Sequence, residues 1–349
     1  MTLTSRIRNE ALRLGFDFCG FSEAKPSPRA DAFGDWIGRG RHAGMGWIAR
    51  DPERRLDPQR VLPGAVSLIS VALSYYLEDP PATLWNDPLR GRVARYAWGR
   101  DYHDVMLPML EELVAFVRSE AGVPVCHRAY VDTGPVLERD VAARAGLGFI
   151  GKNTLLIHPR AGSYMLLGEV LVDVPLEPDL EMIAEAEKGT CGDCRRCQDV
   201  CPTHAFPVPY VLDSNLCISY LTIELKGSIP EPLRPKMGNW IFGCDECQSV
   251  CPWVKQYATA SKQRFLKYEP DWAAPSLLEL IQLDDKAFKD RFAGSPILRP
   301  KRKGLLRNVA VALGNSGRPE AIPSLEKATQ DPEPLIAEHA SWALSRLGR

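Results

Sequence analysis

Two kinds of hydrophobic pattern alternate along the first half of the chain. In the opening segment, MTLTSRIRNEALRLGF, apolar residues are separated by Arg and Glu at helical spacing, which predicts an amphipathic helix. Short apolar runs predict buried strands, and helical spacing returns between them. The mixture predicts an α/β or α+β domain over residues 1–180. The strand candidates are 16–21, 66–73 and 155–157, and the helix candidates are 107–120 and 136–145.

From about residue 275 onward the pattern is helical only. The segment NVAVALGNSG at 308–317 is matched by HASWALSRLG at 339–348, with small and apolar residues in equivalent places. Such self-similarity predicts paired helices of the HEAT-like type. Two copies are too few for a free-standing solenoid, so we expect residues 270–349 to pack on the part of the chain before them.

Composition and charge narrow the class of protein. The chain has 349 residues, of which 45% are hydrophobic and 25% charged, and its formal net charge is -1. These values are typical of a globular protein and exclude a disordered or fibrous one. Because no global field is present, a nucleic-acid surface must be local. The longest apolar run, 61–77, is broken by Pro63, Gly64 and several serines, and the start lacks a secretory pattern, so we expect a cytoplasmic protein without membrane contact.

Eight of the ten cysteines lie between residues 191 and 251. In a reducing compartment, thiols at regular spacing indicate a metal centre rather than disulfides. The first group reads C-G-D-C-R-R-C-Q-D-V-C-P, which is the C-x2-C-x2-C-x3-C-P run of bacterial two-cluster ferredoxins. A second group, C-D-E-C-Q-S-V-C-P, follows a single intervening cysteine. In such runs the fourth cysteine binds the other cluster, and exchanging the two fourth cysteines gives two complete ligand sets.

We define these as the first and the second cysteine set. The first set is Cys191, Cys194, Cys197 and Cys251, and the second set is Cys201, Cys217, Cys244 and Cys247. Two zinc sites are the alternative, because four cysteines with C-x2-C spacing also bind zinc. Zinc gives no reason for a third cysteine at the same step or for a Cys-Pro ending on both groups, so we favour two [4Fe–4S] clusters. We expect Cys19 and Cys126 to be ordinary buried thiols.

Gly146, Gly148 and Gly151 match the G-x-G-x-x-G pattern of dinucleotide sites. That pattern follows a strand and opens a helix, whereas here a helical segment precedes it and an extended one follows. The reversed context argues against a dinucleotide site. We expect the glycines to bring the backbone close to some other ligand.

Several longer motifs occur in order along the chain. They are RLDPQRVLPGA at 55–65, YAWGRDYH at 96–103, YVDTGPVLERDVAARAGLGFIGKNT at 130–154 and CISYLTIE at 217–224, together with the two cysteine groups. With these motifs nearly the whole chain resembles the epoxyqueuosine reductase family. The resemblance implies reduction of epoxyqueuosine to queuosine at the wobble position of tRNA, by cobalamin that receives electrons from two [4Fe–4S] clusters.

The resemblance also implies roles for individual residues. The family's proton donor falls on Asp132, and removal of an epoxide oxygen as water does require such an acid. Asp132 and five further residues stand in motif positions that could contact the cofactor. The D-x-H-x-x-G motif that supplies an axial imidazole is absent, because no glycine follows Asp101-Tyr102-His103 at the required place, so we expect base-off cobalamin. The five further residues are Arg55, Tyr96, Lys152, Asn153 and Ser219.

Basic residues gather in one stretch without an acid, residues 299–307. Like-signed clustering at the head of a helical repeat favours contact with RNA phosphates over a solvated helix face. The stretch at 39–60 is also rich in arginine, but acidic residues dilute it. The residues expected to bind tRNA are Arg299, Lys301, Arg302, Lys303 and Arg307.

These inferences combine into one predicted architecture of class α+β. We expect an N-terminal α/β cobalamin-binding catalytic domain at 1–180, a ferredoxin-like segment with both clusters at 181–260, and α-helical HEAT-like repeats that bind tRNA at 270–349. The expected partners are tRNA with a queuosine-family wobble base and a low-potential electron donor of flavodoxin or ferredoxin type, and we expect a monomer. The alternatives are a corrinoid reductase similar to reductive dehalogenases and a ferredoxin-type carrier whose helical tail binds a protein.

Overall fold

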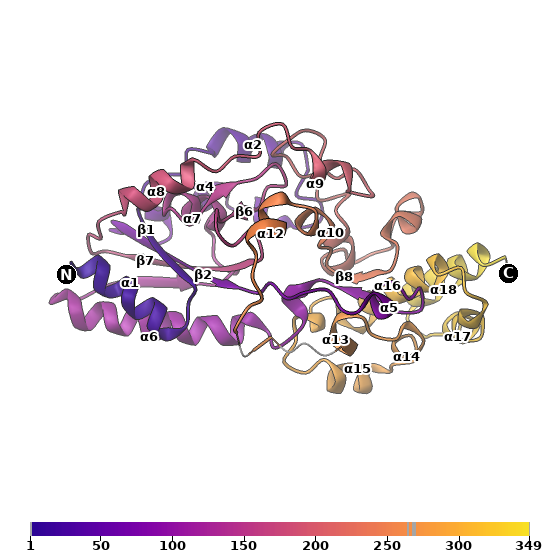
Figure 1. Cartoon of the computed structure of the whole chain (residues 1–349). Helices are drawn as coiled ribbons and strands as arrows, with labels where there is room; N and C mark the ends of the chain where they lie inside the picture. The colour runs from indigo at the N-terminus through magenta and orange to yellow at the C-terminus, as the bar shows by residue number, and fades with distance from the viewer. Residues whose placement is uncertain (1, 264, 267–269, 349) are drawn as a thin grey trace.

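The computed structural model describes residues 2–263, 265–266 and 270–348. Its N-terminal part (Figure 1) is organised by a four-stranded sheet. The strand order is β1-β2-β7-β4, and every neighbouring pair is antiparallel. The chain is therefore a mixed helix and sheet protein, as predicted, and its main sheet has antiparallel rather than parallel pairing. The strands are β1 (Phe18–Glu23), β2 (Ser67–Ser74), β7 (Met165–Val172) and β4 (His127–Tyr130).

The strands lie close to where the hydrophobic runs predicted them. The runs at 16–21 and 66–73 became β1 and β2, each shifted by one or two residues. Both strands are buried along most of their length, and a strand buried on both faces reads as a continuous apolar run. The run at 155–157 became the short strand β6 (Leu156–Ile157), which pairs with β5 (Phe149–Ile150) outside the main sheet.

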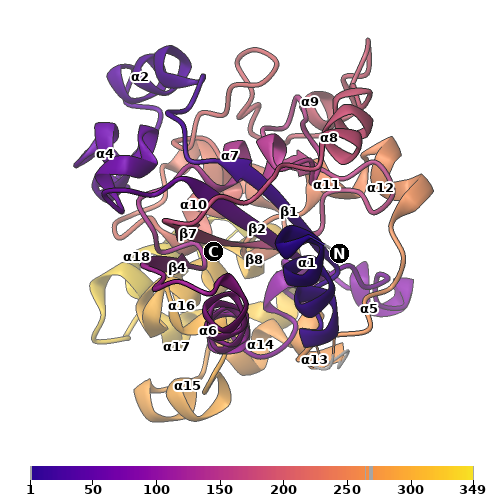
Figure 2. The same ribbon diagram turned by 90° about the vertical axis from the view of Figure 1, so that its left-hand side faces the viewer.

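Helices cover both faces of the sheet, as Figure 2 shows. On one face lie α1 (Leu3–Leu14) and α6 (Tyr102–Ala121), which pack against a core that includes Val71 and Val170. The helix predicted at 107–120 begins earlier, because the Asp101 side chain accepts the backbone N–H of His103 and caps it. On the other face lies α7 (Glu138–Arg144). Further short elements are α2 (Ala30–Gly38), α3 (Gly46–Ala49), α4 (Pro52–Leu56), η1 (Pro58–Arg60), α5 (Ala82–Trp85), β3 (Arg92–Val93) and η2 (Arg95–Ala97).

The glycine motif after α7 serves the packing of the chain itself. As expected from the reversed context, helix α7 precedes it, strand β5 lies within it and strand β6 follows it. A Cβ atom at Gly148 would lie 2.3 Å from the carbonyl oxygen of Ile157, and one at Gly146 would lie 2.9 Å from the backbone nitrogen of Ile183. The expectation that these glycines admit a ligand is therefore wrong at both positions, because the chain's own backbone fills the space.

The cysteine-rich segment contains short helices joined by loops, as predicted. Each cysteine group leads into a helical turn, and Pro252 occupies the first turn after Cys251. Strand β8 (Trp240–Phe242) pairs in parallel with β3, so the segment is joined to the N-terminal part by backbone hydrogen bonds. The helices are α8 (Leu180–Glu187), α9 (Arg196–Asp199), α10 (Ile218–Ile223), η3 (Glu231–Met237), α11 (Glu246–Ser249) and α12 (Pro252–Tyr257).

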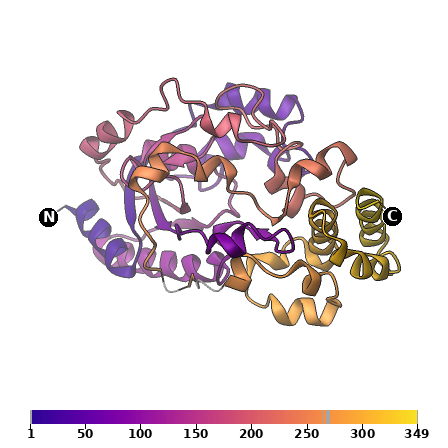
Figure 3. The ribbon, with the colours of Figure 1, turned by 45° about the vertical axis from the view of Figure 1, so that its right-hand side comes forward.

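In residues 270–348 the C-terminal part consists of helices and the loops that join them (Figure 3). The two matching sequence segments fall in α16 and α18, which pack closely, since a Cβ at Gly314 would lie 2.8 Å from Cα of Ala343. These helices share one hydrophobic core with Trp98 and Phe242, so they rest on earlier parts of the chain. The elements are α13 (Pro270–Ala273), α14 (Leu277–Leu280), α15 (Asp285–Arg291), η4 (Pro296–Leu298), α16 (Lys301–Asn315), η5 (Pro319–Ala321), α17 (Ile322–Ala328) and α18 (Pro334–Arg346).

Two smaller predictions have different outcomes. Cys19 is buried, as predicted, and burial raises the pKa of its thiol to about 12. Cys126 is exposed, which contradicts the prediction, because it precedes β4 at the rim of the sheet.

Within the described ranges no helix is both long and apolar enough to cross a bilayer.

Candidate active site and cysteine sets

The four thiols of the first cysteine set lie around one cavity. This cavity has a volume of about 200 Å³, and Asn153 and Trp253 complete its wall. Burial and the neighbouring Cys191, Cys251 and Cys194 thiols raise the pKa of Cys197 to about 11. Cys251, which belongs to the second group in the sequence, thus lies with the first three cysteines in space. The thiols surround a space suited to a cluster of several atoms.

The thiols of the second cysteine set are also mutual neighbours. Burial raises the pKa of Cys247 well above its usual value, and the charges of Cys217, Asp245, Cys197 and Cys201 add to this effect. Burial also raises the pKa of the Cys244 thiol well above its usual value, and the charges of Cys247 and Cys217 add to this effect. Because Cys197 of the first set acts on Cys247 of the second, the two sets adjoin each other. Among the described residues, no three His, Cys, Asp or Glu side chains form a group that could hold a single metal ion.

Backbone N–H groups point at several of the sulfur atoms. The N–H of Ala205 donates to Sγ of Cys201 at 3.3 Å, and the N–H of Lys152 donates to Sγ of Cys191 at 3.4 Å. Backbone N–H groups also donate to Cys217, at the start of α10, and to Cys251, at the start of α12, which lowers the pKa of each thiol against the effect of burial. Such donors stabilise thiolates, which are the form that binds iron.

Lys152 and Asn153 lie against the cysteine loops. Nζ of Lys152 donates to the carbonyl oxygens of Gly192 at 2.5 Å and of Cys194 at 3.1 Å. Asn153 is buried, and its Nδ2 donates to the carbonyl oxygen of Cys247 at 3.4 Å. The structure therefore places these two residues next to the cysteine sets.

Asp132 follows β4 on a loop with an unusual backbone. Its φ of +59° lies in the left-handed region, which costs a residue with a Cβ about 1–2 kcal/mol. The backbone N–H of Asp132 donates to Oε1 of Glu138 at 2.6 Å, and Oδ2 accepts a hydrogen bond of 2.9 Å from the Tyr102 hydroxyl. The side chain of Asp132 remains 65% exposed. The loop thus holds a carboxyl group toward the solvent-accessible side of the molecule.

Two further titratable groups surround Asp132. Nε2 of His103 lies 4.0 Å from Oδ2 of Asp132, and Nδ1 of His103 lies 2.7 Å from Oδ1 of Asp101, which raises the pKa of the imidazole. Burial and the charge of Asp132 raise the pKa of Glu138 to about 8. Asp132 therefore stands between groups that can exchange protons near neutral pH. Sequence reasoning missed Glu138 and His103, although both lie in quoted motifs.

Tyr96 connects this group with the second cysteine set. Its ring lies edge-on to that of Tyr102, with centroids 6.1 Å apart. On its other side, a Cβ at Gly243 would lie 3.6 Å from the ring, and Gly243 directly precedes Cys244. Burial raises the pKa of Tyr96 well above its usual value, and the charge of Asp132 adds to the effect. Ser219 lies at the start of α10, two residues after Cys217.

Arg55 and Arg299 reach the same region from different parts of the chain. Arg55 donates to the carbonyl oxygens of Gly134 and Trp47, each at 3.3 Å. Burial lowers the pKa of Arg55, against the charges of Glu138 and Asp132. Arg299 donates from Nε to Glu224 at 2.9 Å, and its guanidinium lies 5.8 Å from the ring centroid of Trp47.

The predicted tRNA-binding stretch divides into exposed and buried residues. Lys301 and Lys303 are exposed. Arg302 is 14% exposed and is paired with Asp331, and Arg307 is fully buried, donating to the carbonyl oxygens of Leu221, Leu225 and Gly227. The prediction that Arg302 and Arg307 contact RNA is wrong, because both guanidinium groups are used inside the protein.

Two family descriptions match parts of the chain. Residues 190–254 match the 4Fe-4S double cluster binding domain, and residues 55–133 match the family described as epoxyqueuosine reductase QueG, DUF1730. The first match covers both cysteine groups. The second ends one residue after Asp132.

Similar proteins match over the full length. The chain is 40% identical over 348 residues to an epoxyqueuosine reductase of Xanthomonas campestris, covering 99% of this chain and 96% of that protein. It is 39% identical to an epoxyqueuosine reductase of Escherichia coli, covering 99% and 89%.

Two solved structures share the fold. One is an epoxyqueuosine reductase with a tRNA-Tyr epoxyqueuosine-modified stem loop, with a TM-score of 0.90, 33% identity, and coverage of 99% of this chain and 90% of that one. The other is an epoxyqueuosine reductase from Bacillus subtilis whose catalytic aspartate loop is swung out of the active site, with a TM-score of 0.90, 32% identity, and coverage of 99% and 91%.

Proposed function

The chain belongs to the epoxyqueuosine reductase family, and on this premise we propose how its residues carry out the reaction. The protein is an oxidoreductase that reduces epoxyqueuosine in tRNA, with iron–sulfur clusters bound at its cysteine-rich segment. The observation that carries the assignment of roles is the position of Asp132. Two tyrosines connect Asp132 with the second cysteine set: Tyr102 contacts Asp132, and Tyr96 lies between Tyr102 and Gly243, the residue before Cys244.

Asp132 is the proposed proton donor. Opening the epoxide and expelling its oxygen as water consumes two electrons and two protons, and the departing oxygen needs an acid within hydrogen-bond reach. Asp132 offers an exposed carboxyl group whose Oδ2 is fixed by Tyr102. His103 and Glu138 are its neighbours and can return a proton to it after each turnover.

A corrinoid fits the residues between Asp132 and the second cysteine set. Oε2 of Glu224 is buried there without a hydrogen-bond partner in the described part of the chain, and a corrin side-chain amide is a suitable donor for it. Arg55, Tyr96, Asp132 and Ser219 are the proposed contacts. No imidazole motif supplies an axial ligand, which supports base-off binding. Bound cobalamin would supply a metal centre able to deliver two electrons to carbon, which single-electron clusters do not provide.

Electrons are proposed to enter at the first cysteine set and pass to the second, since the two sets adjoin each other. A hollow of about 540 Å³ lies between α9 and α12, next to Cys197 and Cys251. Arg196 and Lys255 line it together with Asp199, and all three are exposed. The two cations, against one acid, suit an acidic, low-potential donor of flavodoxin or ferredoxin type.

Two basic segments are proposed to hold the tRNA. Arg299 lies over the ring of Trp47, so the segments 299–303 and 39–60 meet beside Asp132. Arg299, Lys301 and Lys303 are the proposed phosphate contacts.

We assign 1–180 to cobalamin binding and catalysis, 181–260 to the two clusters and 270–349 to HEAT-like repeats that contact tRNA. Because one chain supplies Asp132 and both cysteine sets, a monomer is sufficient for the reaction. A ferredoxin-type electron carrier, one of the two alternatives, would leave the matched N-terminal segment without a role.

The visible spectrum tests the cofactor assignment. The protein is reconstituted anaerobically with iron and sulfide, mixed with cobalamin and separated by gel filtration. We expect corrinoid bands to elute with the protein beside iron–sulfur absorption. Elution of all corrinoid in the small-molecule fractions would contradict the cobalamin assignment and leave the cluster assignment standing.

A further inference from the structure

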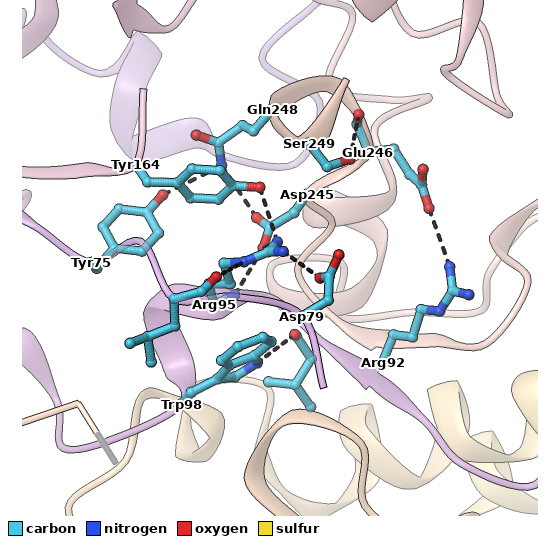
Figure 4. Close-up of polar contacts among 12 residues, drawn as sticks. Tyr75, Asp79, Arg92, Arg95, Trp98, Tyr164, Asp245, Glu246, Gln248 and Ser249 are labelled. Atoms are coloured by element: carbon cyan, nitrogen blue, oxygen red, sulfur yellow. Dashed lines mark hydrogen bonds and ion pairs between the residues drawn. The ribbon is translucent and has the colours of Figure 1, made fainter. Parts of the chain in front are cut away.

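A buried carboxylate lies inside the ligand loop of the second cysteine set. Asp245 stands between Cys244 and Cys247 in the sequence and is 3% exposed. Its Oδ2 accepts hydrogen bonds from the backbone N–H of Arg95 at 2.9 Å and from Nη1 of Arg95 at 3.3 Å (Figure 4). Its Oδ1 accepts a hydrogen bond from Nε2 of Gln248 at 3.2 Å. Burial raises the pKa of the Asp245 carboxyl, and the cationic Arg95 together with these hydrogen bonds opposes that rise. The carboxylate and the guanidinium thus form a buried ion pair.

The positive partner of Asp245 is shared. The side chain of Arg95 is 4% exposed, and its Nη2 also pairs with Asp79. Its Nε donates to the carbonyl oxygen of Leu77 at 2.8 Å. One guanidinium thus faces two carboxylates, of which Asp245 is buried and Asp79 is half exposed to solvent.

We propose that Asp245 acts as a fixed negative charge that lowers the reduction potential of the cluster held by the second cysteine set. The inference rests on the proposed presence of that cluster. Reduction adds one electron from the donor to the cluster, and no bond breaks and no proton moves. A nearby negative charge raises the energy of the more negative, reduced form above that of the oxidised form. Because Asp245 is buried, solvent screens this effect little.

The corresponding loop of the first set lacks such a charge. Its acid, Asp193, lies between Cys191 and Cys194 but is exposed to solvent. The two clusters are therefore expected to differ, and the second cluster is the harder one to reduce. Once reduced, it is the stronger reductant, and it lies on the side of Tyr96 and Asp132 where the reducing power is used.

The substitution Asp245→Asn tests the proposal, because asparagine keeps the shape and an acceptor oxygen but removes the charge. The readout is the midpoint potential of each cluster in the reconstituted protein, followed by electron paramagnetic resonance in a redox titration. We expect the equilibrium constant for reducing the second cluster to rise about tenfold, which is about 59 mV for a one-electron couple. The first cluster is expected to keep its potential.

Two matched variants separate charge from structure. Asp79→Asn removes the other carboxylate partner of Arg95, and the Asp79 side chain is 51% exposed. Asp193→Asn removes the exposed acid of the first loop. Both are expected to leave the two potentials unchanged. Gln248→Met removes a hydrogen bond to Asp245 without changing charge, and we expect a smaller shift than for Asp245→Asn.

An unchanged potential in cluster-loaded Asp245→Asn would overturn the proposal. If that variant binds no second cluster, Asp245→Ser is expected to show the same upward shift, and the wild type offers a test without substitution. The second cluster of the wild type must be reduced at a lower potential than the first, and the reverse order also overturns the proposal. Absence of iron from the reconstituted wild type would instead refute the cluster assignment itself.

Discussion

The Tyr102 hydroxyl donates a hydrogen bond of 2.9 Å to Oδ2 of Asp132. Tyr102 is the first residue of α6 and is nearly buried, so its position is set by the packing of a long helix against the sheet. Asp132, in contrast, lies on a loop with a left-handed backbone. The contact therefore fixes an exposed carboxyl group to a rigid element and keeps it in a defined direction.

The substitution Asp132→Asn is expected to reduce turnover by about 10² or more, because it removes the transferable proton and keeps the shape of the side chain. The rate is measured in single turnover with modified tRNA, and the iron content and the visible spectrum are expected to match the wild type. Asp104→Asn is the matched control, because Asp104 is an exposed acid in the first turn of α6, the helix that begins with Tyr102. Full activity of Asp132→Asn would move the donor to another group, with Glu138 the nearest acid.

The crossed arrangement of cysteines makes a prediction about cluster loss. Cys251→Ser should damage the cluster of Cys191, Cys194 and Cys197, since these four thiols line one cavity. Cys201→Ser should damage the other cluster. Iron analysis with electron paramagnetic resonance on each variant distinguishes the two signals. Loss of the same signal from both variants would show that the sets are not crossed.

The division of the basic stretch predicts different effects for neighbouring residues. Replacing the exposed Lys301 and Lys303 by Ala should weaken tRNA binding and flatten its salt dependence, by up to about 0.7 in the log–log slope for each lost contact. Arg307→Met should instead reduce the free energy of unfolding by about 3 kcal/mol or more, because it leaves buried carbonyl groups without donors. Fluorescence anisotropy at several salt concentrations and denaturant unfolding measure the two effects. An unchanged salt slope for the double lysine variant would exclude contact of these lysines with phosphates.

Charge reversal at the hollow between α9 and α12 tests the entry of electrons. The double variant Arg196→Glu, Lys255→Glu should slow reduction of the clusters by an acidic flavodoxin at least about tenfold at low salt. Bleaching by dithionite, measured by the same stopped-flow absorbance, should be unaffected because dithionite needs no protein contact. The double variant Lys286→Glu, Lys289→Glu on α15 changes the net charge by the same amount and serves as the control. Equal rates for the two double variants would place the donor elsewhere.

Acid should weaken the C-terminal part of the protein through His339. This side chain is fully buried, accepts the N–H of Ile229 at 3.2 Å, and has a pKa lowered by burial from 6.5 to about 4. The unfolded chain binds a proton more readily than the folded one between these values. Stability is thus complete above about pH 6.5 and falls as the pH drops toward 4, by up to about 1.4 kcal/mol for each pH unit.

Urea midpoints measured between pH 7 and pH 5 test this dependence. His339→Gln cannot take up the proton, so its midpoint should fall less with acid than that of the wild type. Parallel curves for the two proteins would contradict the assigned role of His339.

Periodicity and spacing predicted those features that depend on local sequence. The buried strands β1 and β2 and helix α6 are of this kind. The sequence pattern did not predict which side chains from distant parts of the chain face each other. Arg307 and Lys303 look alike in a charged run, yet the turn of α16 directs one toward carbonyl groups of α10 and leaves the other exposed.

The groups around Asp132 show the same limit. Glu138 is six residues away in sequence, His103 lies on another element and Arg299 comes from the C-terminal part. The sheet with the helix packed on it positions His103, and the packing of the C-terminal part brings in Arg299. The glycine motif likewise gave no sign that the chain's own backbone, at Ile157 and Ile183, fills the space beside it.

The most direct test is the conversion of the substrate itself. Transfer RNA that carries epoxyqueuosine is incubated anaerobically with the reconstituted, cobalamin-loaded protein and a low-potential reductant, and the wobble nucleoside is then analysed by mass spectrometry. We predict that the wild type yields queuosine, lighter by one oxygen atom, and that Asp132→Asn leaves the epoxide largely intact. Persistence of the epoxide with a wild-type protein that shows both the corrinoid and the iron–sulfur bands would contradict the account.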